Sequence, residues 1–219
     1  MSNTITHIYL MPGLAASPKI FNNLIFPKNK VELHYLEWIL PLSEKEKLED
    51  YAKRMSELVT EANPVLIGVS FGGILVQEIS KFLRPKKIII ISSIKSSDEL
   101  PKRLKLIQKT KAYKLFPAKA ISNIEAFSVF AFGEFAKKRV KLYQEYLSVR
   151  DEKYLKWAVF NVLNWKQKTS PKNIIHIQGE KDHIFPIKNI SNCISIPNGT
   201  HIMILTKAKR ISKIITDIL

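Results

Sequence analysis

Cysteine, glycine, acidic side chains and long apolar runs are all scarce in this sequence of 219 residues. A single cysteine, Cys193, cannot form a disulfide within the chain and cannot by itself build a thiolate metal site. No apolar run approaches the roughly 18 residues that a membrane-spanning helix needs, and the first residues lack a basic segment ahead of a long apolar one. We therefore expect a cytoplasmic protein without a membrane partner.

Acidic residues are outnumbered, since 19 Asp and Glu stand against 35 Lys and Arg and leave a net charge of +16. The excess lies mainly in residues 95–172, which hold 18 basic and 7 acidic residues. One explanation is a lysine-rich solvated helical surface, and the other is attraction of an anionic substrate, such as an acyl group on an acidic carrier protein or on coenzyme A. No motif for DNA or RNA binding accompanies the charge, so we expect no nucleic-acid partner.

Strand and helix patterns alternate along much of the chain, with one interruption. Strand patterns cover residues 6–11, 31–38, 64–70, 86–93, 172–182 and 192–201, and helical patterns cover 43–62 (with Ser43 as N-cap), 72–84 and 206–219. Continuous apolar strands that alternate with helices indicate an α/β protein with a mostly parallel sheet and helices on both faces. Between the fourth and fifth strands only helical patterns occur. The sequence thus predicts a core of residues 1–94 and 169–219 and a helical insertion of residues 95–168.

Three of the few glycines lie close together, around one serine. At an average usage of about 7% a chain of this length would hold about 15, yet it holds 7, and three of them fall within residues 68–73. That stretch reads Gly-Val-Ser-Phe-Gly-Gly and contains the pattern G-x-S-x-G between a predicted strand and a predicted helix. A serine on so sharp a turn is strained, and only glycine fits easily at Gly68 and Gly72. The alternative is a packing turn in which Ser70 is inert.

Four segments together resemble the α/β-hydrolase superfamily over nearly the whole chain. They are "GVSFGG" around Ser70, "MPGLAAS" after the first strand, "GEKDHIFP" after the fifth and "NGTHIM" after the last. They occur in that family's order of nucleophile, acid and histidine. The resemblance implies the α/β-hydrolase fold, with the helical insertion as its cap, and an enzyme that needs neither a cofactor nor a metal.

A serine hydroxyl becomes a strong nucleophile only beside a base, and an imidazole base needs a carboxylate to orient it. His7, His34 and His176 lie inside predicted strands, where packing is their expected role. The resemblance implies Ser70 as nucleophile, His201 as base and Asp182 as acid. The alternatives are His183 for the base and Asp98 or Glu180 for the acid.

An oxyanion hole requires two N–H groups that point at the developing negative oxygen. The resemblance implies that they belong to Phe71, which follows the nucleophile, and to Leu14 in the loop after the first strand. Many members of the family have a histidine ahead of the glycine in that loop, where this chain has Met11 and Pro12. No ligand-spaced cluster of His and Cys appears, so we expect no metal. The predicted activity is hydrolysis of a small ester or thioester, and an anionic substrate is one option. A non-catalytic binding protein on the same scaffold and a lyase or C–C hydrolase with the same triad are the alternatives.

Overall fold

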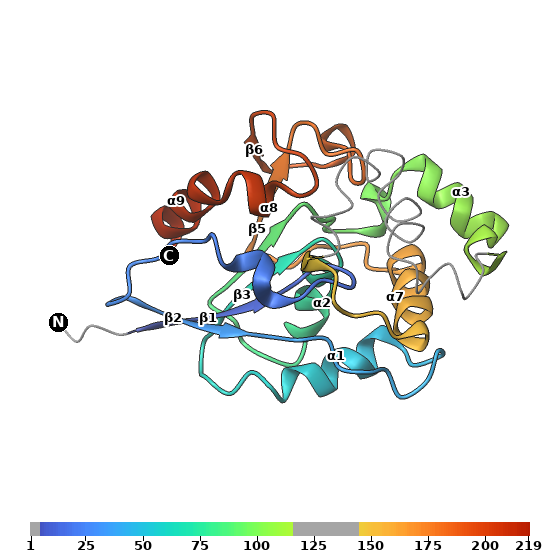
Figure 1. Cartoon of the computed structure of the whole chain (residues 1–219), viewed down its shortest axis with the longest axis horizontal. Coiled ribbons are helices and arrows are strands. Elements are labelled where there is room, and N and C mark those ends of the chain that lie inside the picture. Colours follow the sequence, from blue (N-terminus) through green and yellow to red (C-terminus); the bar gives the residue numbers. More distant parts are fainter. Residues whose placement is uncertain (1–4, 116–144) are drawn as a thin grey trace.

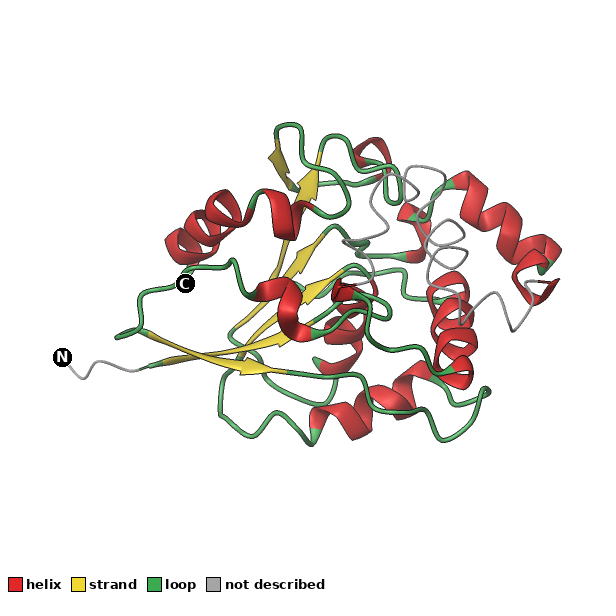
Figure 2. Ribbon diagram, in the orientation of Figure 1, coloured by secondary structure: helices red, strands yellow, loops and turns green. Residues whose placement is uncertain are grey.

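The computed structural model describes residues 5–115 and 145–219, and six of its strands form one parallel sheet (Figures 1 and 2). The strands are β1 (Thr6–Met11), β2 (Val31–Tyr35), β3 (Val65–Val69), β4 (Lys87–Ile91), β5 (Ile174–Gly179) and β6 (Ile194–Ile196). Their order across the sheet is β2-β1-β3-β4-β5-β6, and every neighbouring pair is parallel. The predicted α/β class and parallel sheet are therefore confirmed.

Helices cover both faces of this sheet (Figure 1). Helices α1 (Leu48–Ser56) and α2 (Phe71–Ile79) pack together on one face. The short helices η1 (Pro18–Phe21) and α8 (Met203–Thr206) lie with α9 (Ala208–Ile218) on the other. All five residues of β3 are buried, as a strand covered on both sides requires. This explains why the central strands read as continuous apolar runs and not as an alternation.

Helix α1 begins five residues later than the sequence pattern predicts, and Ser43 is not its N-cap, because the helix starts at Leu48 after Lys47. The buried residue Glu46 accounts for the difference. Its carboxylate accepts a hydrogen bond from the guanidinium of Arg54, and its carbonyl oxygen accepts one from the indole N–H of Trp157. These tertiary contacts hold the segment before Leu48 in a turn. The other predicted elements differ from the observed ones mainly at their ends.

Part of the predicted helical insertion can be compared with the structure. Its described helices are η2 (Ser97–Glu99), α3 (Lys102–Thr110), η3 (Ala112–Leu115) and α7 (Glu152–Asn164). Residues 116–144 of the predicted insertion lie outside the described residues, and the limits of the insertion stay a prediction. Asp151 caps α7, since its carboxylate accepts from the N–H of Tyr154 at 2.8 Å. Across the two described ranges, no helix combines the length and the apolar character that crossing a membrane requires.

Candidate active site

Ser70 lies on a strained turn between β3 and α2. Its backbone has φ 54° and ψ −118°, a conformation that side chains rarely adopt. The turn is held from two sides: the N–H of Ser70 donates to the Ile91 carbonyl at 2.9 Å, and the Ser93 hydroxyl donates to the Ser70 carbonyl at 2.7 Å. Ser93 is fully buried beyond the end of β4. The neighbouring strand thus stabilises the backbone conformation that lifts the Ser70 side chain above the sheet edge.

The glycines on either side of Ser70 are required by close backbone contacts. A Cβ atom at Gly68 would lie 2.2 Å from the carbonyl oxygen of Gly72. A Cβ atom at Gly72 would lie 2.3 Å from the carbonyl oxygen of Pro12, in the loop after β1. Both distances are far below van der Waals contact and involve backbone that cannot rotate away. The G-x-S-x-G spacing is therefore a steric requirement of this turn, as the sequence pattern predicts.

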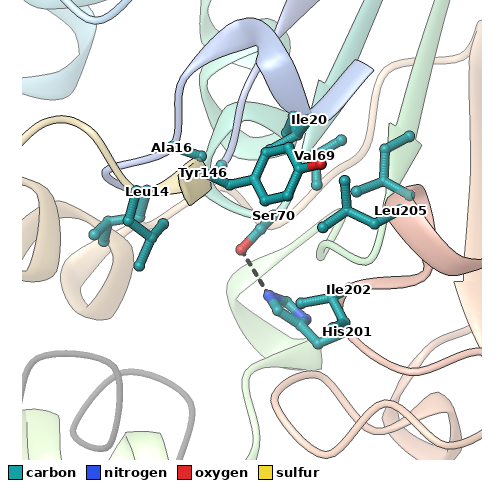
Figure 3. A pocket seen from close by; sticks show the side chains of 12 residues that line it. Leu14, Ala16, Ile20, Val69, Ser70, Tyr146, His201, Ile202 and Leu205 are labelled. Carbon is teal, nitrogen blue, oxygen red and sulfur yellow. Dashed lines mark hydrogen bonds between the residues drawn. The ribbon is translucent and has the colours of Figure 1, made fainter. Parts of the chain in front are cut away.

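Three side chains from distant parts of the sequence meet at the carboxyl edge of the sheet. Ser70 Oγ lies 3.0 Å from His201 Nε2 (Figure 3), and His201 Nδ1 lies 2.9 Å from Asp182 Oδ2. Asp182 follows β5 and His201 follows β6, so the parallel order of the strands brings their loops beside the Ser70 turn. The structure thus brings together the three residues that the sequence analysis predicts as nucleophile, base and acid.

Asp182 is only 3% exposed, and four donors satisfy its carboxylate. Oδ1 accepts from the N–H groups of Ile184 and Phe185 at 2.8 and 2.9 Å, and Oδ2 accepts from Gln178 Nε2 at 3.0 Å and faces His201 Nδ1. Burial by itself would raise the pKa of Asp182, but the charge of His201 and the hydrogen bonds from His201, Phe185 and Ile184 outweigh it and lower the pKa below its ordinary value. The carboxylate is therefore ionised at neutral pH, as a partner for an imidazolium must be.

Behind this carboxylate lies a fully buried amide that the sequence analysis did not identify. The Gln178 side chain donates to both Asp182 and the Phe185 carbonyl, and its Oε1 lies 3.0 Å from His176 Nε2. Burial, the main cause, lowers the pKa of His176 to about 4, so its ring is neutral near pH 7. His176 therefore has a second role besides the predicted packing. Its neutral ring N–H can orient the Gln178 amide, which in turn orients the Asp182 carboxylate.

Replacing Gln178 by methionine tests this positioning role. The change roughly keeps the side-chain volume, but the Asp182 carboxylate and the Phe185 carbonyl each lose one hydrogen-bond donor. Because both groups are buried, we expect a loss of about 1–3 kcal/mol in the free energy of unfolding. We also expect kcat to fall about tenfold with little change in KM, because the acid loses its alignment to His201. The control is Gln167→Met, which removes a comparable amide bonded to Gln77 and the Lys95 carbonyl, away from Asp182. An equal fall in kcat in both variants would contradict the role.

The alternative acids and the alternative base are exposed at the surface. Asp98 is 67% exposed and pairs with Lys168 at 2.6 Å. Glu180 is exposed and accepts from the N–H of Asn198 at 3.3 Å. His183 is exposed beside the buried Asp182, as expected for alternating residues of a short loop.

The loop after β1 carries Leu14, whose N–H is one predicted oxyanion donor. Gly13 and Ala15 on either side of it are held by two aromatic side chains: Trp38 Nε1 donates to the Gly13 carbonyl at 2.9 Å, and the Ala15 N–H donates to the Tyr154 hydroxyl at 3.2 Å. Burial raises the pKa of Tyr154 well above its ordinary value, so this hydroxyl stays neutral. The loop is therefore held in place through its backbone, and the Leu14 N–H is not used in these contacts.

Phe71 supplies the second predicted oxyanion donor and belongs to the same aromatic cluster. Its ring stacks on Trp38 with centroids 5.0 Å apart, and it also contacts Trp157 of α7. Phe71 and Leu14 line one hollow together with Ser70 and His201. Sequence analysis did not identify Trp38, Tyr154 or Ser93 as supports of the site, since nothing in their local sequence marks them.

Two apolar hollows open from Ser70, and His201 and Leu14 border both of them. The first lies between the loop after β1, η1 and α8 (Figure 3), and the second lies between α3, α7 and the loop after β5. Further residues of the first are Ala16, Ile20, Val69, Tyr146, Ile202 and Leu205, and those of the second include Leu104, Ile107, Val159, Val162, Ile184 and Phe185. The described lining of both hollows contains neither lysine nor arginine.

One group of side chains could hold a metal ion, although the sequence shows no ligand-spaced cluster of His and Cys. The ligand atoms of His7, Glu32 and His34 lie within 4.8 Å of one another. These residues come from β1 and β2, on the far side of β1 from the strand β3 that leads to Ser70. The spacing of these three residues along the sequence does not predict the cluster, because it forms only when the two strands pair in their observed register.

No protein-family model and no curated protein matches this sequence. Solved structures do match it over nearly its whole length. A lipase-esterase related protein from Clostridium acetobutylicum shares 15% identity, with 100% of this chain and 96% of that chain covered and a TM-score of 0.65. A hydrolase from Pseudomonas aeruginosa shares 12% identity, with 97% and 89% covered and a TM-score of 0.70. A thermophilic esterase from Thermogutta terrifontis shares 14% identity, with 98% and 89% covered and a TM-score of 0.61.

At these identities the likeness is one of architecture, and it agrees with the parallel sheet, with the sharp turn at Ser70 and with the order of the motifs along the chain. This protein therefore has the α/β-hydrolase fold.

Proposed function

We propose that this protein is a serine hydrolase that cleaves a small carboxylic ester or thioester through an acyl-enzyme. The observation that carries the proposal is the unbroken hydrogen-bond chain from Ser70 Oγ through His201 to Asp182, beside two hollows that open from the serine. The hydrolase and the esterase among the similar structures support the same reaction class.

In the acylation step, His201 Nε2 takes the proton of Ser70 as Oγ attacks the carbonyl carbon of the substrate. The carbonyl oxygen becomes an oxyanion that accepts hydrogen bonds from the N–H groups of Leu14 and Phe71. Asp182 stabilises the imidazolium and holds the remaining proton on Nδ1. When the intermediate collapses, the C–O or C–S bond breaks, and His201 gives its proton to the departing alcohol or thiol.

In the deacylation step, a water molecule replaces the leaving group beside His201. The imidazole removes one proton from this water as its oxygen attacks the acyl carbon, and the same oxyanion donors stabilise the second intermediate. Collapse breaks the bond to Ser70 Oγ, which recovers its proton from His201. The cycle consumes one water molecule and releases a carboxylic acid together with the alcohol or thiol of the first step.

The lining of the hollows favours apolar groups on both sides of the scissile bond. A carboxylate or phosphate next to the reacting carbonyl would lose its hydration without a counter-charge, because the described lining has neither lysine nor arginine. Lys102, Arg103 and Lys109 on α3 are exposed instead. We therefore propose an uncharged substrate at the reaction centre; an acidic carrier protein would contact these basic residues at the surface.

Labelling with a fluorophosphonate probe tests the proposal directly. The folded protein is expected to take up one equivalent, with the mass increase on the peptide that contains Ser70, because only an activated serine attacks such a phosphorus centre. Heat-unfolded protein and the Ser70→Ala variant serve as controls and should stay unlabelled. A folded protein that does not react would instead support a non-catalytic binding protein on this scaffold.

A further inference from the structure

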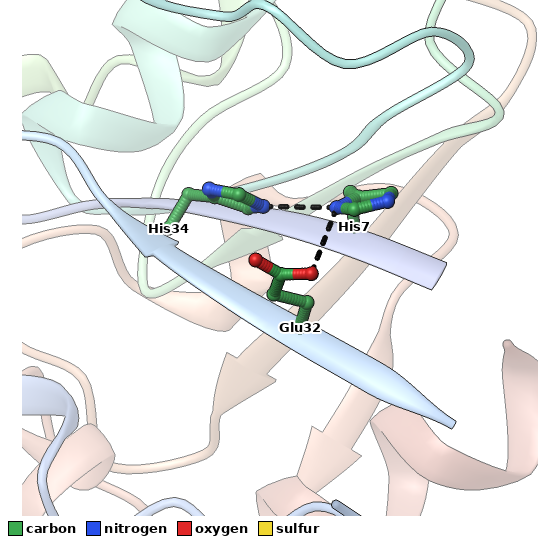
Figure 4. A group of neighbouring side chains, drawn as sticks. All are labelled: His7, Glu32 and His34. Atoms are coloured by element: carbon green, nitrogen blue, oxygen red, sulfur yellow. Dashed lines mark hydrogen bonds and ion pairs between the residues drawn. The ribbon is translucent and has the colours of Figure 1, made fainter. Parts of the chain in front are cut away.

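A second cluster of chemically active side chains lies on the edge of the sheet, apart from Ser70. In the register of β1 and β2, His7 stands opposite Glu32 and Tyr9 stands opposite His34, so these four side chains share one face. His7 Nδ1 lies 3.0 Å from His34 Nε2 and 3.7 Å from Glu32 Oε2 (Figure 4). Three potential ligand atoms therefore converge on one point between the two strands.

From this convergence we infer that His7, His34 and Glu32 form a binding site for a divalent transition-metal ion such as Zn²⁺. Neighbouring ligand atoms around a tetrahedral zinc are about 3.3 Å apart, given Zn–N and Zn–O bonds of about 2.0–2.1 Å. The His7–His34 and His7–Glu32 separations lie within about half an ångström of that value. Side-chain rotation alone can bring all three atoms onto one ion, and water supplies the fourth ligand.

A carboxylate near the second ring nitrogen of His7 supports its assignment as a metal ligand. Such a ring usually donates its second N–H to a carboxylate, which fixes the tautomer and the ring orientation. His7 Nε2 lies 3.8 Å from Glu61 Oε2, on the side of the ring that faces away from His34. Without an ion, the short contact between the two rings needs one ring proton between them. With an ion bound at Nδ1, the His7 proton sits on Nε2 and points at Glu61.

The Tyr9 side chain positions both the His34 ring and the backbone at Glu61. Its ring stacks on His34 with centroids 4.4 Å apart and an interplanar angle of 11°, which limits the directions in which the His34 nitrogen can point. Its hydroxyl oxygen accepts hydrogen bonds from the N–H groups of Thr60 and Glu61, each at 3.2 Å. One buried side chain thus positions both a ligand and the backbone of the outer carboxylate.

The chemical type of the three ligands and their exposure to solvent determine which ions the site can bind. Two imidazoles and one carboxylate suit zinc, nickel and copper, whereas magnesium and calcium prefer oxygen alone. The His7 side chain is 24% exposed and that of Glu32 is 55% exposed, so an ion can enter directly from solvent. Because β2 is an edge strand of the sheet as far as the structure describes the chain, a bound ion would link it to β1 through side chains as well as through the backbone.

Titration calorimetry of the full chain with ZnCl₂ tests the inference. We expect one ion per chain at this site, and we expect Glu32→Gln, Glu61→Gln and His34→Ala each to weaken binding at least about tenfold. Glu32→Gln is the decisive variant, because it changes an exposed side chain by one atom and leaves the fold unchanged. His201→Ala is the matched control, since it removes an imidazole that lies beside a carboxylate at the other site, and it should leave the affinity unaltered.

A thermal-shift measurement supplies a second readout that does not depend on catalysis. Zn²⁺ should raise the melting temperature of the wild type and of His201→Ala but not that of His34→Ala, because only a site in the folded state stabilises by mass action. Equal zinc affinity in the wild type and Glu32→Gln would overturn the inference. So would loss of binding in His201→Ala, or no binding to the wild type at all.

Discussion

Replacing Ser70 by alanine is expected to lower kcat for a p-nitrophenyl ester by about 10⁴- to 10⁶-fold, because both half-reactions pass through the serine oxygen. Asp182→Asn should lower kcat by about 10⁴-fold, since an amide cannot stabilise the imidazolium and favours the wrong tautomer of His201. The two effects should not add, because without the nucleophile the orientation of the base no longer matters. A double variant no slower than Ser70→Ala is therefore part of the expected result.

The kinetic comparison needs a control that removes an imidazole without touching the triad. His183→Ala provides it, because His183 is exposed and directly follows Asp182 in the sequence. We expect this variant to keep most of the wild-type kcat, and we expect circular dichroism to show folded protein in all four variants. If His183→Ala lost activity as completely as a change at His201, the assignment of the base would be wrong.

Much of the fold and of the candidate site follows from local sequence. Apolar β-branched runs between helical patterns indicate a buried parallel sheet. The glycines flanking Ser70 indicate a sharp turn in which side chains at their positions would collide. The choice of Asp182 and His201 rests on the resemblance to the α/β-hydrolases. Their places after strands agree with it, because the carboxyl ends of parallel strands share one edge.

What the sequence did not reveal depends on packing between distant elements. Trp38 and Tyr154 hold the loop around Leu14 through one hydrogen bond each, and no pattern distinguishes them from other core aromatics. Helix α1 starts late because buried Glu46 bonds to Arg54 of α1 itself and to Trp157 of the distant helix α7. The His7 cluster depends on strand register, which a pattern of apolar residues does not specify when one strand lies at the sheet edge.

Replacing Gly72 by alanine is the second change from which we expect a large effect. It tests the contact that supports the loop after β1, which carries the Leu14 N–H, and it leaves the Ser70 side chain in place. The new Cβ would lie 2.3 Å from the Pro12 carbonyl oxygen and 2.4 Å from that of Met11, so helix α2 and the loop after β1 must move apart. We expect a loss of about 2–3 kcal/mol in the free energy of unfolding. We also expect kcat to fall about 10²- to 10³-fold, the usual cost of losing one oxyanion donor, because the same movement displaces the Leu14 N–H.

The matched control for this change lies in the same loop. A Cβ at Gly13 would make ordinary contacts of 3.5 Å with Ser70 Cβ and the Val69 carbonyl oxygen, and no positive φ opposes it. Urea unfolding should therefore place Gly13→Ala within about 1 kcal/mol of the wild type, whereas Gly72→Ala unfolds at a clearly lower concentration. A Gly72→Ala protein as stable and as active as Gly13→Ala would mean that the loop does not pack against the start of α2, and the second oxyanion donor would have to be sought elsewhere. A stable but slow Gly72→Ala protein would instead place the whole effect on the Leu14 N–H, because only catalysis depends on its position to within a fraction of an ångström.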